Sequence, residues 1–216
     1  MGTAGRKKDP VRTAATRNTF LKTSYELFSS KNIESVTMSE IAKKSGYRDM
    51  TLYRYFPSKA ILVVAVATWI WTQTIEVNRE RRPSRDLQGM TAAEILDFYL
   101  ESYIELYRNK RDILRFNQFF KIYIQSEKID PAVLKPYRDM IEGLKSDFHT
   151  MYTRAKEDYT VRTDESEEKM FSRTLHLMLA AVTRYAVGLV YIPEEGFDAE
   201  EELEFQKDAI LNKYLC

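Results

Sequence analysis

Residues 37–59, TMSEIAKKSGYRDMTLYRYFPSK, decide the fold of this chain. Thr37 stands three residues before Glu40, which is the spacing of a capping box that opens a helix. Gly46 interrupts that helix, and it suits a sharp turn because it has no Cβ to resist positive φ. A further short helix is predicted over residues 48–55. Two short helices joined by a tight glycine turn form a helix-turn-helix, whose second helix fits the major groove of DNA.

The rest of the chain also reads as helix. It has only 7 Gly and 6 Pro in 216 residues, too few for the frequent turns that strands and hairpins need. Caps and apolar spacing predict an all-α fold of about nine helices. Their expected ranges are 10–32, 38–44, 48–55, 59–81, 91–109, 113–126, 131–159, 167–190 and 198–215. We expect Asn32 to end the first helix in a left-handed turn, and residues 79–89 to form a linker.

Composition excludes several classes of protein. The single Cys216 rules out an internal disulfide framework, and two histidines rule out a metal site built on several of them. The polar, basic start predicts no secretory signal, and the longest apolar stretch, 61–67, is too short to span a bilayer. There is no Ser/His/Asp set and no phosphate-binding Gly loop, so we expect neither an enzyme nor a cofactor. A cytoplasmic protein with no membrane partner is predicted.

Charge is distributed unevenly along the chain. Residues 1–60 hold 12 basic and 5 acidic side chains, a net charge of +7, while the remaining residues carry −6. A positive N-terminal part on an acidic body indicates a surface for phosphate. The basic tail with Arg6, Lys7, Lys8 and Arg12 is either a minor-groove or phosphate arm or a solvated extension.

The run from Phe20 to Leu62 resembles the N-terminal domain of the tetracycline-repressor (TetR) family. The resemblance rests on Leu27-Phe28, Thr37, Ile41-Ala42, Gly46 and above all residues 52–59, LYRYFPSK. It implies an N-terminal three-helix helix-turn-helix domain over residues 1–57. A helical effector-binding and dimerisation domain would then follow over residues 58–216.

The resemblance also implies which residues contact DNA. Thr37 would offer its hydroxyl and a backbone N–H to a phosphate. Arg48 could bind a guanine through two hydrogen bonds, and Thr51 could touch a thymine methyl group or a phosphate. Tyrosine hydroxyls and one lysine at the start of the fourth helix would meet backbone phosphates. The whole set is Thr37, Arg48, Asp49, Met50, Thr51, Tyr53, Tyr55 and Lys59.

Four positions depart from the family pattern. Asn32 stands where Gly is usual, Tyr47 replaces a small aliphatic residue, and Arg48 replaces a small capping residue. Asp49 is unusual beside phosphates, unless it accepts a hydrogen bond from cytosine or pairs with Arg48. These departures bear on which operator is read.

The resemblance implies that the C-terminal body dimerises and binds a small molecule. The helix from Glu167 is apolar nearly all round, so it must be covered on nearly all sides, either by a dimer partner or within the core of a monomer. Aromatic and polar residues at helical spacing are either core or effector pocket. The candidate pocket residues are Trp69, Tyr99, Tyr103, Asn117, Phe120, Tyr123 and His176.

Together these features predict a homodimeric transcriptional regulator that binds double-stranded DNA at a palindromic operator. Repression, with release by a small-molecule effector, is the expected mode. The alternative is a helical protein-interaction module that keeps the helix-turn-helix fold and senses no effector.

Overall fold

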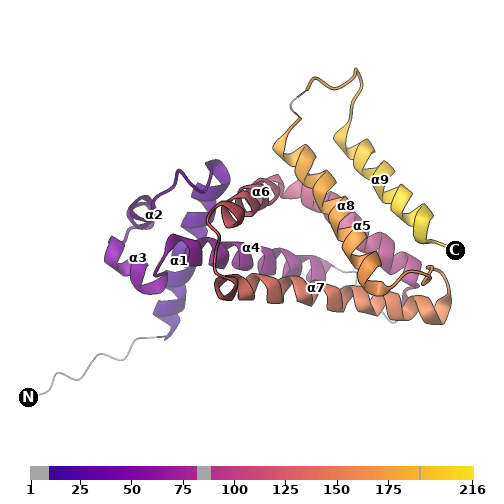
Figure 1. Ribbon diagram of the computed structural model, residues 1–216, viewed down its shortest axis with the longest axis horizontal. Coiled ribbons are helices and arrows are strands. Elements are labelled where there is room, and N and C mark those ends of the chain that lie inside the picture. The colour runs from indigo at the N-terminus through magenta and orange to yellow at the C-terminus, as the bar shows by residue number, and fades with distance from the viewer. Residues whose placement is uncertain (1–9, 82–88, 190) are drawn as a thin grey trace, which may run out of the picture. The chain divides into compact units, whose positions relative to one another are not determined.

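The computed structural model describes residues 10–81, 89–189 and 191–216, and Figure 1 shows their course. Within those residues the chain forms nine α-helices, as the sequence predicts. Their bounds are α1 (Pro10–Ser30), α2 (Met38–Lys44), α3 (Asp49–Tyr55), α4 (Lys59–Arg81), α5 (Ala92–Asn109), α6 (Arg111–Ser126), α7 (Pro131–Asp158), α8 (Glu167–Val187) and α9 (Ala199–Tyr214). Arg6, Lys7, Lys8 and most of the expected linker lie outside the described residues.

The helices group into two compact units. The first comprises residues 1–70 and 119–137, and the second comprises residues 71–118 and 138–216. Helices α4, α6 and α7 each contribute residues to both. The boundary expected after residue 57 separates a DNA-reading part from the remainder, and it stays a prediction about function.

In the first unit, α1, α2 and α3 pack around a small apolar core. Phe20 and Phe28 of α1 are fully buried, together with Ile41 of α2 and Leu52 of α3. Each such side chain contributes about 1.5–3 kcal/mol through burial. Helix α2 contacts both α1 and α3, which fixes the angle of the helix-turn-helix.

Asn32 does not end α1 in a left-handed turn. Among the described non-glycine residues, only Lys128 and Tyr159 have positive φ. Asn32 instead accepts a hydrogen bond on Oδ1 from the backbone N–H of Ser35 at 2.9 Å. This local side-chain bond turns the chain without left-handed backbone, so the expectation was wrong.

In the second unit, α5 packs against both α8 and α9, and α8 also packs against α9 (Figure 1). Arg108 of α5 reaches the carboxylates of Glu200 and Glu204 of α9 at 2.8 and 3.0 Å. Lys207 of α9 reaches Glu101 of α5 at 2.7 Å. These ion pairs add a charged network to the apolar contact between the two helices.

The apolar character of helix α4 extends beyond the uninterrupted apolar stretch 61–67. Over Lys59–Glu80 it is long and apolar enough, by length and composition, to cross a membrane. The apolar residues continue at helical spacing past the stretch 61–67. Within the helix, Leu62, Val63 and Val66 are fully buried against other protein side chains. Of the apolar window of this helix, 28% is buried within the protein.

Candidate nucleic-acid interface and effector cavity

The turn between α2 and α3 follows from two local features. Thr37 begins α2, and its side-chain oxygen accepts a hydrogen bond from the backbone N–H of Glu40 at 3.1 Å. Gly46 lies at φ +76° in the turn, where an L side chain would be strained. The backbone N–H of Tyr47 then donates to the carbonyl of Ala42 at 2.9 Å. Thr37 therefore caps α2 as predicted, and the turn presents α3.

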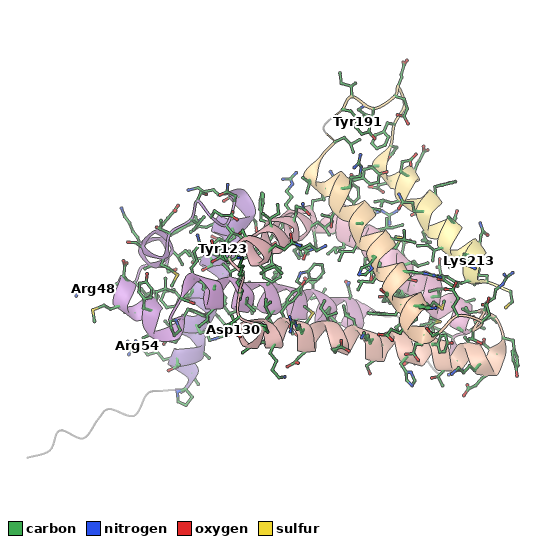
Figure 2. All side chains as sticks on the ribbon, viewed as in Figure 1. Arg48, Arg54, Tyr123, Asp130, Tyr191 and Lys213 are labelled. Carbon is green, nitrogen blue, oxygen red and sulfur yellow. The ribbon has the colours of Figure 1, made fainter. Side chains whose placement is uncertain are left out.

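Helix α3 buries one face and leaves the other open. Leu52 is fully buried, whereas Arg48, Asp49 and Tyr53 are exposed and Met50 is 87% exposed. Arg48 occupies the N-cap position of α3, and its side chain does not cap the helix. In Figure 2, Arg48 and Arg54 extend away from the ribbon. The exposed face thus presents a cation, a carboxylate, a thioether and a phenol, which together can read groove edges and phosphates.

Two residues of the expected DNA-contacting set are partly engaged within the protein. The carboxylate of Asp49 accepts a hydrogen bond from Ser39 Oγ at 3.3 Å, which ties the start of α3 to α2. The ring of Tyr55 packs on Phe20 with a centroid distance of 5.6 Å. Tyr55 therefore buries part of its ring. Thr51 is half-buried one turn before it.

Lys59 is directed into the protein. Its Nζ donates to the backbone carbonyl of Glu34 at 3.1 Å and lies 5.7 Å from the centre of the Tyr123 ring. Burial lowers the pKa of Lys59, although the charges of Glu34 and Glu127 oppose the shift. The lysine is thus held by backbone and aromatic groups of the first unit, and its predicted phosphate contact stays untested.

Sequence reasoning missed two further cations on this part of the chain. Arg54 is exposed on α3, and its guanidinium lies 5.7 Å from the centre of the Tyr55 ring. Arg17 is exposed on α1, and its guanidinium lies 5.3 Å from the centre of the Phe56 ring. The signal available in the sequence was a basic residue at a helix position between those of the apolar core residues.

A cavity of about 80 Å³ lies in the second unit among α4, α5 and α7. Its walls are mainly apolar and aromatic, with Phe98 and Tyr99 from α5 and Phe148 from α7. Tyr99 is the residue of the expected effector pocket that lines it. Tyr103 lies behind Tyr99 and donates to its hydroxyl at 2.8 Å.

An ion pair adjoins these aromatic walls. Arg79 of α4 donates from Nε and Nη2 to Oδ2 of Asp147 of α7, at 3.0 and 2.9 Å. Both residues line the cavity. The sequence placed Arg79 both at the end of the expected helix 59–81 and at the start of the expected linker 79–89, and the structure places it in α4. Neither residue was expected at the site.

The remaining expected pocket residues do not line this cavity. Trp69, Phe120 and Tyr123 belong to the first unit, where Trp69 packs edge-on against Tyr25. Asn117 is fully buried on α6, and neither polar atom of its side chain has a hydrogen-bond partner among the residues that the structure describes. His176 is exposed on α8, and its Nδ1 lies 3.5 Å from Ser172 Oγ.

Within the described ranges, no group of three or more His, Cys, Asp or Glu side chains could hold a metal ion. The site is thus an open helical face in one unit and an aromatic cavity with an ion pair in the other.

Comparison with known proteins adds the family context. Residues 20–66 match the family described as bacterial regulatory proteins, tetR family. The chain is 25% identical over 202 residues to YvdT of Bacillus subtilis, an uncharacterized HTH-type transcriptional regulator, covering 93% of this chain and 94% of YvdT. It is 26% identical over 146 residues to YerO of Bacillus subtilis, likewise an uncharacterized HTH-type transcriptional regulator. That match covers 61% of this chain and spans only half the length of YerO.

Solved structures share the fold. A transcriptional regulator from Saccharomonospora viridis, crystallised with choline, superposes with a TM-score of 0.72. It is 16% identical, and the match covers 94% of this chain and 99% of that one. At this identity the likeness establishes the fold alone.

Proposed function

Because the chain belongs to the tetR family of bacterial regulatory proteins and is a transcriptional regulator, we propose that it is a homodimeric repressor. It binds a palindromic operator in double-stranded DNA and is released by a small-molecule effector. The observation that carries this proposal is the open face of α3, where Arg48, Met50 and Tyr53 are exposed beside a rigidly capped turn.

The DNA-reading part of the proposal assigns residues 1–57 to the operator. The N-terminal residues of α3 meet base edges, and Thr37 and Tyr53 meet phosphates. The exposed cations Arg17 and Arg54 add phosphate contacts. Two copies related by a two-fold axis would read half-sites about 34 Å apart.

The dimer is supported by uncovered apolar surface on the last two helices. Leu177 of α8 is 56% exposed and Phe205 of α9 is 71% exposed. A groove of about 300 Å³ between these helices is lined by Leu177, Ile210 and Tyr214. Large apolar side chains exposed together on adjacent helices are typical of an interaction surface. A second copy of the chain would cover them in a symmetric interface.

The effector is supported by the cavity beside Tyr99 and by the fold relative that was solved with choline. Effector binding lowers operator affinity if the effector prefers a body conformation in which the reading helices no longer fit both half-sites. We assign the protein to the cytoplasm, where its DNA lies, and to no catalytic role.

Selection from a random-sequence DNA library tests the proposal. The purified chain is mixed with the library at two salt concentrations, and bound DNA is recovered by gel shift. An enriched palindrome whose binding weakens steeply with salt is expected. A folded dimer that enriches no sequence would contradict operator binding and favour the interaction-module alternative.

A further inference from the structure

The cavity among α4, α5 and α7 combines aromatic walls with one opposed pair of charges. The charged groups are the guanidinium of Arg79 and the carboxylate of Asp147, joined by two hydrogen bonds to the same oxygen. Phe98, Tyr99 and Phe148 line the same space. The ion pair therefore borders an apolar, aromatic space.

The two partners of this ion pair differ in their exposure to solvent. The Arg79 side chain is 45% exposed, whereas the Asp147 side chain is 22% exposed. A long, half-exposed arginine can turn its charged head into water with little desolvation cost, because its stem is flexible. The Asp147 carboxylate sits on a short side chain and is less exposed, so it reaches less far from α7 than the guanidinium reaches from α4. A ligand can thus replace the guanidinium more readily than the carboxylate.

Building on the proposed effector function, we propose that this cavity binds an organic cation carrying N–H donors, such as an amine, amidine or guanidine on an apolar body. Its cationic head replaces the Arg79 guanidinium on Asp147. Its apolar body lies against Phe98, Tyr99 and Phe148.

The requirement for N–H donors follows from what the arginine now supplies. Asp147 Oδ2 receives hydrogen bonds from both Nε and Nη2 of Arg79. A cation without N–H groups would compensate the charge and leave that oxygen without these two bonds, which is costly for a partly buried acceptor. An ammonium, amidinium or guanidinium restores them.

The requirement for positive charge follows from the walls. Aromatic faces attract cations and repel anions, because the ring carries negative charge on its faces. Burial raises the pKa of Tyr99 to about 12, so this residue stays a neutral phenol at neutral pH. An anionic ligand would draw Arg79 away and leave Asp147 without its guanidinium in an apolar setting.

A matched set of benzyl compounds tests the proposal by isothermal titration calorimetry at neutral pH. Benzylamine carries the charge and the N–H donors, benzyl alcohol is neutral, benzyltrimethylammonium is charged without N–H groups, and phenylacetate is an anion. We expect benzylamine to bind at least tenfold more tightly than each of the other three. Equal or tighter binding of benzyl alcohol or phenylacetate would overturn the requirement for a positively charged ligand. Equal or tighter binding of benzyltrimethylammonium would overturn the requirement for N–H donors.

Two substitutions separate the roles of the ion-pair partners. Asp147→Asn keeps the shape and removes the charge, and it should weaken benzylamine binding at least tenfold. Arg79→Gln removes the competing guanidinium, and it should tighten benzylamine binding several-fold. Glu142→Gln, on the same helix outside the cavity and paired with Lys145, is the control and should change nothing. Weaker binding in Arg79→Gln would overturn the proposal even if Asp147→Asn failed to fold.

Operator binding is measured on the same preparations. A chain that binds its selected operator but prefers benzyl alcohol to benzylamine would refute the ligand class and leave the proposed function intact. A chain that binds benzylamine through Asp147 but enriches no DNA would refute the proposed function instead.

Discussion

Arg48 is the residue on which base reading depends most directly. It lies exposed at the N-cap of α3, and its side chain contributes no cap to the helix. Arg48→Ala should therefore leave the fold intact and weaken operator binding by about 1–3 kcal/mol, the worth of a bidentate base contact. Tyr53→Phe removes one exposed hydroxyl and should cost less. Gel shifts with the selected operator, and with operators changed at single base pairs, measure both effects.

The control for these variants is Lys145→Ala, which removes a half-exposed cation of the second unit that pairs with Glu142 at 3.1 Å. Unchanged operator affinity in both Arg48→Ala and Tyr53→Phe would remove the assignment of α3 as the reading helix. A uniform loss across all operators in Arg48→Ala would move that residue from base reading to phosphate contact.

Lys59 gives a residue-scale prediction in which the structure and the family resemblance differ. Its Nζ is occupied by the carbonyl of Glu34 and the ring of Tyr123. Lys59→Met should therefore lower the free energy of unfolding by about 1 kcal/mol, for one charge-assisted hydrogen bond at a partly exposed site. The salt dependence of operator binding should stay unchanged. A salt slope reduced by about one unit would return Lys59 to the phosphate-contacting set.

Individual residues divide into those that local sequence predicts and those that it does not. Thr37 caps α2 because its partner, Glu40, lies three residues away. Lys59, by contrast, meets Glu34 and Tyr123, which lie far from it along the chain. Spacing along a helix carries no information about such partners. The same reason explains why Arg79 and Asp147 escaped notice as a pair.

At the scale of the helices, the start of α5 depends on the end of α7. Asp158 accepts hydrogen bonds from the backbone N–H groups of Ala92 at 2.7 Å and Thr160 at 2.9 Å. Burial alone would raise the pKa of Asp158, but these hydrogen bonds outweigh it and lower the pKa below its ordinary value. A carboxylate at a helix N-terminus also gains from the helix dipole.

Asp158→Asn should therefore lower the free energy of unfolding at neutral pH by about 1–2 kcal/mol, the range for a lost helix cap. The stabilisation from a lowered carboxylate pKa is complete above the unfolded-state value and is lost as pH falls through the folded-state value. The wild-type chain should consequently lose more stability on acidification than Asp158→Asn does. Urea unfolding across this acidic range measures the difference.

Glu157→Gln is the matched control for this prediction. Glu157 is the preceding residue of α7, exposed, and 3.7 Å from Arg154 in a surface pair of small energy. If Asp158→Asn and Glu157→Gln had the same free energy of unfolding and the same acid dependence, the hydrogen bond from Ala92 to Asp158 would contribute nothing to stability.

Helix boundaries were the most predictable feature of the fold, because caps are local. Thr91 and Glu94 form a complete capping box at the start of α5. Asp130 accepts from the backbone N–H of Ala132 at 2.8 Å and so begins α7. At Thr37 only one hydrogen bond of the expected capping box is seen, the one from the backbone N–H of Glu40 to the Thr37 side chain. The Glu40 carboxylate is instead paired with Lys31, with 2.8 Å between Oε1 and Nζ. Competition from a distant cation thus changes a cap without moving the helix start.

On the scale of the whole molecule, the sequence predicted an all-α chain with a helix-turn-helix at its start, and the structure confirms both. The position of the cavity was not predictable, because α4, α5 and α7 meet there through three separate stretches, residues 75–79, 95–102 and 144–151. Aromatic residues at helical spacing fill cores as well as pockets. Of the seven expected pocket residues, periodicity could not separate Tyr99, which lines the cavity, from Phe120, which is buried in the other unit.

The proposed dimer yields the last prediction. Leu177 of α8 is exposed and lines the groove between α8 and α9, and Phe205 of α9 is exposed as well. Leu177→Glu should dissociate the dimer, because a symmetric interface would bury the new carboxylate once from each copy without a partner. Sedimentation velocity at micromolar concentration measures the oligomeric state, and a gel shift with full and half operators measures the consequence.

Ile122→Glu is the control, because Ile122 is an equally apolar, exposed residue on α6 that should not disturb the dimer. A monomeric Leu177→Glu should bind a half-site about as well as the wild-type chain does, since α3 is unchanged. It should lose most of its affinity for the full palindrome, because the second half-site is no longer reached by a linked copy. A dimer that survives both Leu177→Glu and Phe205→Glu would place the interface elsewhere. A wild-type monomer that still binds the palindrome tightly would show that symmetry in the operator needs no preformed symmetry in the protein.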